Sequence, residues 1–116
     1  MKWESLKDKP DEINKLIAEN FMGWSEEIMP ASILPDYSTN IIYAWEVIDK
    51  IISEDKYAQV DIIIEITENW VIIENGVPVE PWKQSEGKRH ISVEAGENTA
   101  PLAICHAALL YKGVIE

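Results

Sequence analysis

The chain has 116 residues, 47% of them hydrophobic, and its 21 acidic and 10 basic side chains give a net charge of −11. This length suits one domain, residues 1–116, with a modest core. The acidity argues against binding of nucleic-acid duplexes, which needs Lys and Arg, and of anionic membranes. One cysteine, no apolar run of about 20 residues and no apolar leader together predict a cytoplasmic protein.

The first helix is predicted by the residues at its two ends. Pro10 suits a first helical turn, and Asp11 and Glu12 favour the N-terminal end of a helix. Apolar residues recur at helical spacing up to Gly23, so we expect a helix over 10–22. An irregular loop follows, since the next 16 residues contain two prolines and several polar side chains. The residues expected to anchor the N-terminal arm and this loop are Trp3, Trp24, Ile28, Met29 and Tyr37.

A second helix is the clearest element of the sequence. Ser38 or Thr39 can cap it, and the apolar residues that follow recur at a spacing of three and four. We expect Trp45 to lie in the core because it belongs to this apolar stripe. The full stripe comprises Ile41, Ala44, Trp45, Ile48, Ile51 and Ile52.

Strands are predicted where the apolar period changes from 3.6 to 2. Alternation over 60–67 and 70–74, separated by a turn at Glu68-Asn69, predicts a hairpin in which Trp70 belongs either to the core or to a sheet face. Alternation returns over 88–95. Two prolines make 77–82 an edge strand or an extended loop. The segments are short and locally connected, which favours antiparallel pairing.

A last helix is expected to begin around 98–101 and to end at Tyr111, before Gly113. It is apolar nearly all round, so it is buried on more than one side or shared with a second subunit. We therefore expect a homo-oligomer whose interface draws on Ala107, Ala108, Leu110 or Tyr111. The fold class is α+β, with an antiparallel sheet of three to four strands packed between or against helices.

Catalytic and metal-binding patterns are weak. Cys105 and His106 are neighbours on a helix and point about 100° apart, so Cys105 is expected in the core, and His106 is either solvated or a ligand contact. Asp61 and Glu65 share a strand face about 13 Å apart, too far for a carboxylate pair. One Cys and two His give no zinc spacing. We expect no catalytic residues, no metal site and no cofactor, and hence no enzyme.

Basic residues gather in one place in this acidic chain, next to a tryptophan in a predicted loop. The cluster comprises Trp82, Lys83, Lys88, Arg89 and His90. It is either a solvated turn or a patch that binds phosphate or carboxylate. The start of the last helix, at Thr99, would add backbone N–H groups to such an anion site, and His106 would add a ring nitrogen.

Several segments together resemble the phage ABA sandwich domain family, small proteins of phages and prophages of Gram-positive bacteria. They span most of the chain in the order of the family: Asp11–Glu19, Met22–Trp24, Tyr37–Asn40, Ala44–Ile48 and Asn98–Leu109. The resemblance implies a phage gene product with a sheet sandwiched by helices and without an assigned activity. The family often has Arg or Lys where His106 stands, which would make an anion contact there weaker or pH-dependent.

Two hypotheses of function follow. In the first, the protein is a non-enzymatic decoy that sequesters an anionic nucleotide signal of host defence in the cytoplasm of the host cell. The alternative is a protein-interaction module whose acidic surface imitates nucleic acid or docks on a basic host protein.

Overall fold

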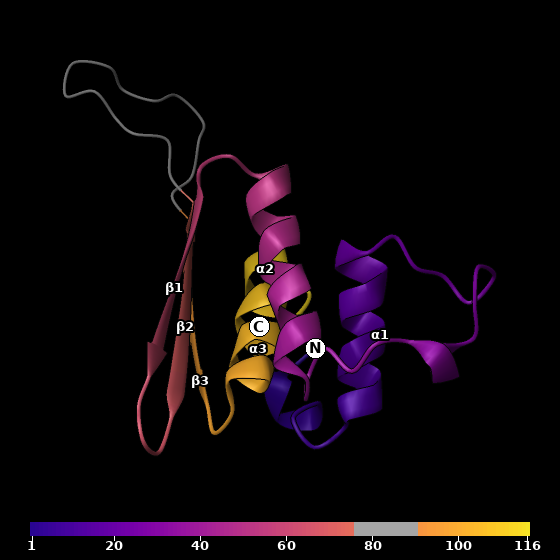
Figure 1. Cartoon of the computed structure of the whole chain (residues 1–116), viewed down its shortest axis with the longest axis horizontal. Coiled ribbons are helices and arrows are strands. Elements are labelled where there is room, and N and C mark those ends of the chain that lie inside the picture. The colour runs from indigo at the N-terminus through magenta and orange to yellow at the C-terminus, as the bar shows by residue number, and fades with distance from the viewer. Residues whose placement is uncertain (76–90) are drawn as a thin grey trace.

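The computed structural model describes residues 1–75 and 91–116 and has an α+β fold, as predicted (Figure 1). Three helices, α1 (Pro10–Phe21), α2 (Ile41–Glu54) and α3 (Ala100–Lys112), accompany three strands, β1 (Ala58–Ile64), β2 (Asn69–Asn75) and β3 (Ile91–Glu97). Two short 3₁₀ helices are also present. One, η1 (Trp3–Ser5), lies in the N-terminal arm, and the other, η2 (Ala31–Ile33), lies in the loop between α1 and α2, residues 22–40, here called the crossing loop. The prediction for 77–82 and the first residues of 88–95 fall outside the described residues.

The sheet is antiparallel in the order β1-β2-β3. Its helices lie on one face only, with α2 and α3 against the sheet and α1 beyond them (Figure 1). Of the two arrangements that the sequence left open, the described residues form the one in which the sheet packs against helices rather than between them. The other face of the sheet is uncovered by any described element.

α3 is the central element of the core. It packs on β2, β3, α2 and α1, which explains why its sequence is apolar nearly all round. Ala107 and Ala108 are fully buried within one chain, so they are not free to form the expected subunit interface. Gly113 adopts a positive φ of 77° and ends the helix.

Hydrogen bonds to one carboxylate, that of Asp55, join the ends of α2, β2 and α3. Asp55 follows α2, and its Oδ2 accepts from the Tyr111 hydroxyl of α3 at 2.5 Å and from the Asn75 side-chain amide at the end of β2. Burial, followed by the bond to Asp55, raises the pKa of Tyr111 to about 12. Tyr111 is half-buried, and its hydroxyl is bonded within the chain.

The structure corrects three expectations about α2 and the loop before it. Trp45 is 49% exposed rather than in the core, because the buried stripe of the helix runs through Ala44, Val47, Ile48 and Ile51. The cap is Asn40, whose side chain accepts from the Ile42 N–H, and not Ser38 or Thr39. In the loop, Trp24 and Tyr37 are buried as expected. Two expected anchors are instead exposed: Ile28 and Met29.

Candidate functional site

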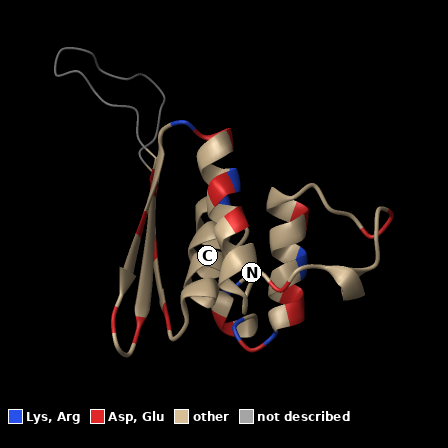
Figure 2. Cartoon of the chain, in the orientation of Figure 1, with Lys and Arg blue, Asp and Glu red and all other residues tan. Residues whose placement is uncertain are grey.

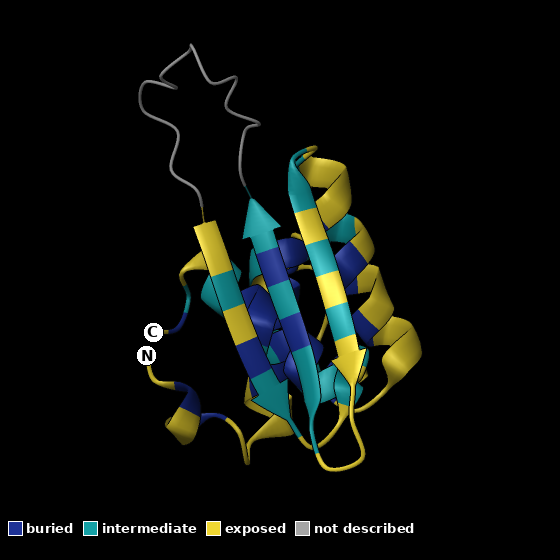
Figure 3. Cartoon of the chain, turned by 90° about the vertical axis from the view of Figure 1, so that its left-hand side faces the viewer, coloured by how far each residue is buried: buried dark blue, intermediate teal, exposed yellow. Residues whose placement is uncertain are grey.

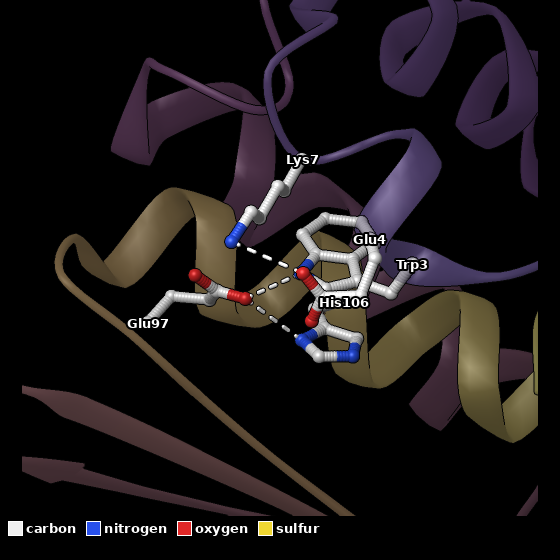
Figure 4. Close-up of polar contacts among 5 residues, drawn as sticks. All are labelled: Trp3, Glu4, Lys7, Glu97 and His106. Carbon is white, nitrogen blue, oxygen red and sulfur yellow. Dashed lines mark hydrogen bonds and ion pairs between the residues drawn. The ribbon is translucent and has the colours of Figure 1, made fainter.

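His106 belongs to a polar cluster that closes the N-terminal arm onto the core (Figure 4). Its ring stacks on the indole of Trp3 with 4.1 Å between centroids and an interplanar angle of 8°. Glu97, at the end of β3, accepts with one oxygen from Trp3 Nε1 at 2.5 Å and lies 3.0 Å from His106 Nδ1. Since a carboxylate only accepts, Nδ1 carries the ring proton. His106 is therefore neither simply solvated nor free for a ligand through this nitrogen.

Burial and the neighbouring carboxylates shift the pKa of His106 in opposite directions. Burial lowers its pKa, and the negative charge and hydrogen bond of Glu97 partly oppose that effect. Glu4 adds a smaller opposing influence and is itself paired with Lys7 at 3.1 Å. Within the described residues, no Ser, Cys or Lys side chain is hydrogen-bonded to His106. The cluster thus has the histidine–carboxylate pair of a general base but no nucleophile joined to it.

A cleft of about 410 Å³ lies beside this cluster, between the N-terminal arm, the β1–β2 turn and the entry to α3. Asp8, Glu68 and Glu97 line it together with one cation, Lys7. Three carboxylates against one ammonium disfavour an anion in this cleft. Thr99, the residue before α3, is exposed, and its side chain makes no capping hydrogen bond.

A second cleft, of about 400 Å³, separates α1 from the crossing loop. Its ionisable lining is again mostly acidic, with Asp11, Glu12 and Asp36 against Lys15. The basic cluster predicted to bind an anion falls outside the described residues: Trp82, Lys83, Lys88, Arg89 and His90. Of the seven candidate site residues, the structure therefore places only two, Thr99 and His106.

Cys105 is a core residue, as expected. Its side chain is fully buried on α3, and burial raises the pKa of its thiol. Among the described residues, no three His, Cys, Asp or Glu side chains are grouped so that they could hold a metal ion. None of the described helices is long and apolar enough to cross a membrane.

The uncovered side of the sheet, here called the open face, was not anticipated as a site. Alternation from the buried Val71, Ile73 and Ala95 fixes which residues point to it. The register forms three rows across the strands: Ile63–Trp70–Gly96, Asp61–Ile72–Glu94 and Gln59–Glu74–Ser92. The described strands contain no Lys or Arg, as Figure 2 shows. The open face therefore has an apolar end, which Ile72 extends into the middle row, and carboxylates in the other two rows.

Trp70 and Gly96 form the apolar end of the open face. A Cβ at Gly96 would lie 2.8 Å from the Trp70 ring and 2.8 Å from a Glu68 carboxylate oxygen, so the ring lies directly over the glycine backbone. Of the two positions predicted for Trp70, the core or a sheet face, the structure shows the sheet face. The signal in the sequence was the run of apolar residues, Ile63 and Ile72 included, at positions that alternation assigns to the outer side.

Comparison with known protein families shows to which family the chain is related. The sequence profile of the phage ABA sandwich domain matches residues 15–109. The chain belongs to this family. No curated protein and no solved structure matches it. Glu97 and His106 lie within the matched part of the phage ABA sandwich domain, whereas Trp3 and Lys7 precede it. The cluster in Figure 4 is thus completed by residues from outside the match.

Proposed function

We propose that the chain is a non-enzymatic binding protein of a phage that docks on a basic host protein through the open face of its sheet. The observation that carries this proposal is the open face itself, which has an apolar end, carboxylates beside it and no described helix over it. Burial of Ile63, Trp70 and Ile72 would supply affinity. The carboxylates would attract and orient a basic surface.

Three carboxylates on the strands contribute to the charge of this surface, in addition to Glu68 beside Gly96. Asp61 and Glu94 stand in the row with Ile72, and Glu74 stands in the next row. Asp61 and Glu94 are exposed and make no ion pair within the described residues. A surface of this kind also competes with nucleic acid for a basic groove, since both present negative charge to the same Lys and Arg side chains.

The nucleotide-decoy hypothesis depends on different residues. Its basic cluster lies outside the described residues, and in both described clefts the carboxylates outnumber the cations by three to one. The decoy hypothesis uses His106 as a ligand contact, but Nδ1 of His106 is already hydrogen-bonded to Glu97. The described surface therefore favours the interaction module. The decoy hypothesis is tested in parallel by calorimetry with cyclic and ADP-ribose nucleotides, for which the interaction module predicts no heat of binding.

The test reverses charge on the open face and, separately, far from it. The double variant Asp61→Lys/Glu94→Lys changes the open face, and Glu26→Lys/Glu27→Lys makes the same charge change in the exposed loop after α1. A basic protein captured from host lysate by wild type is purified and titrated with all three proteins. We expect the open-face variant to bind at least about 30-fold more weakly, the loop variant to bind nearly as wild type, and added salt to weaken the complex.

Two results would contradict this proposal. One is equal loss of binding in the two charge-reversal variants, which would show that only net charge matters. The other is a complex insensitive to both salt and the open-face variant, which would place the contact elsewhere on the molecule.

A further inference from the structure

An apolar stripe on α2 is left exposed by the part of the chain that the structure describes. Ile41, Trp45 and Ile52 are 46%, 49% and 47% exposed and follow helical spacing along one side of α2. Tyr43, nearly opposite on the helical wheel, makes an edge-to-ring contact with Tyr37 of the crossing loop. The stripe therefore faces away from that loop.

The free edge of β1 lies on the same side of the molecule. The strand order places β1 at the edge of the sheet, so its outer backbone groups have no strand partner among the described residues. β1 contains no Pro, Gly, Lys or Arg, the residues that commonly protect an edge from pairing. Ile64, at its end, is 76% exposed. Figure 3 shows the exposed side of α2 and the outer edge of β1 turned in the same direction.

We propose that this surface, the α2–β1 flank, binds a second copy of the chain. Antiparallel pairing of β1 with β1 of the second copy obeys a two-fold axis and extends the sheet from three strands to six. The same axis brings the two α2 stripes together behind the sheet. One occupant thus covers both unpartnered features, which a lone peptide strand or a lone helix would not do.

Charge favours a second copy over a foreign basic partner at this flank. The three stripe residues are uncharged, although the exposed Asp49 borders them, four residues after Trp45 and three before Ile52. The one charged residue of β1, Asp61, points to the open face. A pairing centred on Ile62 sets Asp61 opposite Ile63 of the other copy, so the two aspartates do not oppose each other. With Asp49 as the one acidic side chain at the border of the stripe, the flank meets less of the repulsion that a net charge of −11 imposes on self-association elsewhere.

The exposed area is of the right order for a dimer. At roughly 150–200 Å² for a large apolar side chain, the four exposed residues of the flank offer about 400 Å². A standard interface buries about 800 Å² on each partner, and the paired strand with its side chains supplies the remainder. The four residues are Ile41, Trp45, Ile52 and Ile64.

The experiment is sedimentation equilibrium on the full chain. We expect a dimer for wild type and, for Trp45→Lys and Ile52→Lys, a dissociation constant raised by about 30-fold or more. Ile33→Lys is the matched control, since Ile33 is an equally apolar residue, 63% exposed, on η2 and remote from the flank. This control should dimerise as wild type. Circular dichroism checks that every variant folds.

The salt dependence of dimerisation distinguishes this inference from the proposed function. Screening reduces repulsion between two acidic copies, so dimerisation should hold or strengthen as salt rises, whereas binding of a basic partner should weaken. A monomeric wild type at high micromolar concentration overturns the inference, as does a dimer that the two flank variants leave intact. Neither result bears on the open face, whose own variants carry the charge reversal.

Discussion

At the scale of single residues, one carboxylate oxygen organises the junction between the N-terminal arm and the core. Glu97 accepts from the Trp3 indole and holds the Nδ1 proton of His106, and the two rings stack. Trp3 itself is 6% exposed. Burial favours the neutral imidazole, whereas the Glu97 carboxylate favours the protonated one, so the stability of the arm depends on the protonation state of His106.

The first prediction concerns pH. Burial lowers the pKa of His106 in the folded chain, so the unfolded chain binds the proton more readily. The stabilisation is complete above the unfolded value of about 6.5 and is lost as pH falls through the lower folded value. The free energy of unfolding should therefore decrease between about pH 7.5 and about pH 5.5, and this decrease should be smaller in His106→Gln.

Denaturant unfolding followed by tryptophan fluorescence measures this difference. Equal pH slopes in wild type and His106→Gln would show that the ring does not control the junction.

At the scale of elements, one buried amide fixes the crossing loop to α1. Asn14 is 4% exposed, and its Oδ1 accepts from both the backbone N–H and the hydroxyl of Ser38, each at 3.0 Å. Its amide nitrogen donates to Asp36 at 3.4 Å. These bonds set where the loop ends, and therefore where α2 begins three residues later.

The second prediction separates the two halves of this anchor. Asn14→Ala leaves the buried Ser38 N–H without a partner and should lower the free energy of unfolding by about 2 kcal/mol. Ser38→Ala removes only the hydroxyl and keeps the backbone bond, so its cost should be about 1 kcal/mol. Chemical denaturation gives both values. An equal or reversed order would mean that the backbone bond does not hold the loop.

Elements of this chain were predictable to different degrees, for physical reasons. α1 and α3 were found within a few residues because Pro10, Gly23 and Gly113 mark ends through backbone geometry, which is local. For α2, the predicted buried side was rotated slightly from the observed one. The apolar residues of α2 cover a wider arc of the helix than the core of one chain buries. Trp45 lies in that excess, and periodicity alone does not tell a core stripe from an interface.

The candidate site was less predictable than the fold. His106 was singled out for its polarity on an apolar helix, but its partners Trp3 and Glu97 lie 103 and nine residues away in sequence, and only tertiary packing joins them. The open face was hidden for a related reason. Alternation predicts two sides of a sheet but does not say which of them the helices cover.

At the scale of the whole molecule, acidity dominates the surface. The ion pairs present in the described residues, Lys7–Glu4, Lys15–Glu12 and Lys50–Glu54, are exposed and local. Pairs of this kind contribute little to stability. The excess of 21 acidic over 10 basic side chains should therefore act mainly as repulsion within the folded chain.

The third prediction follows from that repulsion. Raising sodium chloride from about 0.01 M to 0.15 M should raise the melting temperature by a few degrees, because screening relieves more repulsion than attraction. Calorimetry on Trp45→Lys removes the contribution of self-association to the melting temperature. Potassium chloride should give the same shift. A fall in melting temperature would mean that the ion pairs outweigh the excess charge.

Two copies joined at the α2–β1 flank would present their open faces side by side on one six-stranded sheet. A basic partner would then meet a surface twice as wide, with the carboxylates repeated across the two-fold axis. Partners that are themselves two-fold symmetric would bind such a surface with an effective concentration advantage over binding one copy.

Because Cys105 is buried, the proposed dimer can be measured by labelling a second, introduced cysteine. It is the one cysteine of the chain, and with its thiol fully buried and its pKa raised, it is protected from reagents that need an exposed thiolate. A cysteine introduced at the exposed Gln59 would then be the one position to take a spin label. Each dimer would carry two identical labels related by the two-fold axis, so one interspin distance would report directly on how the two β1 strands meet.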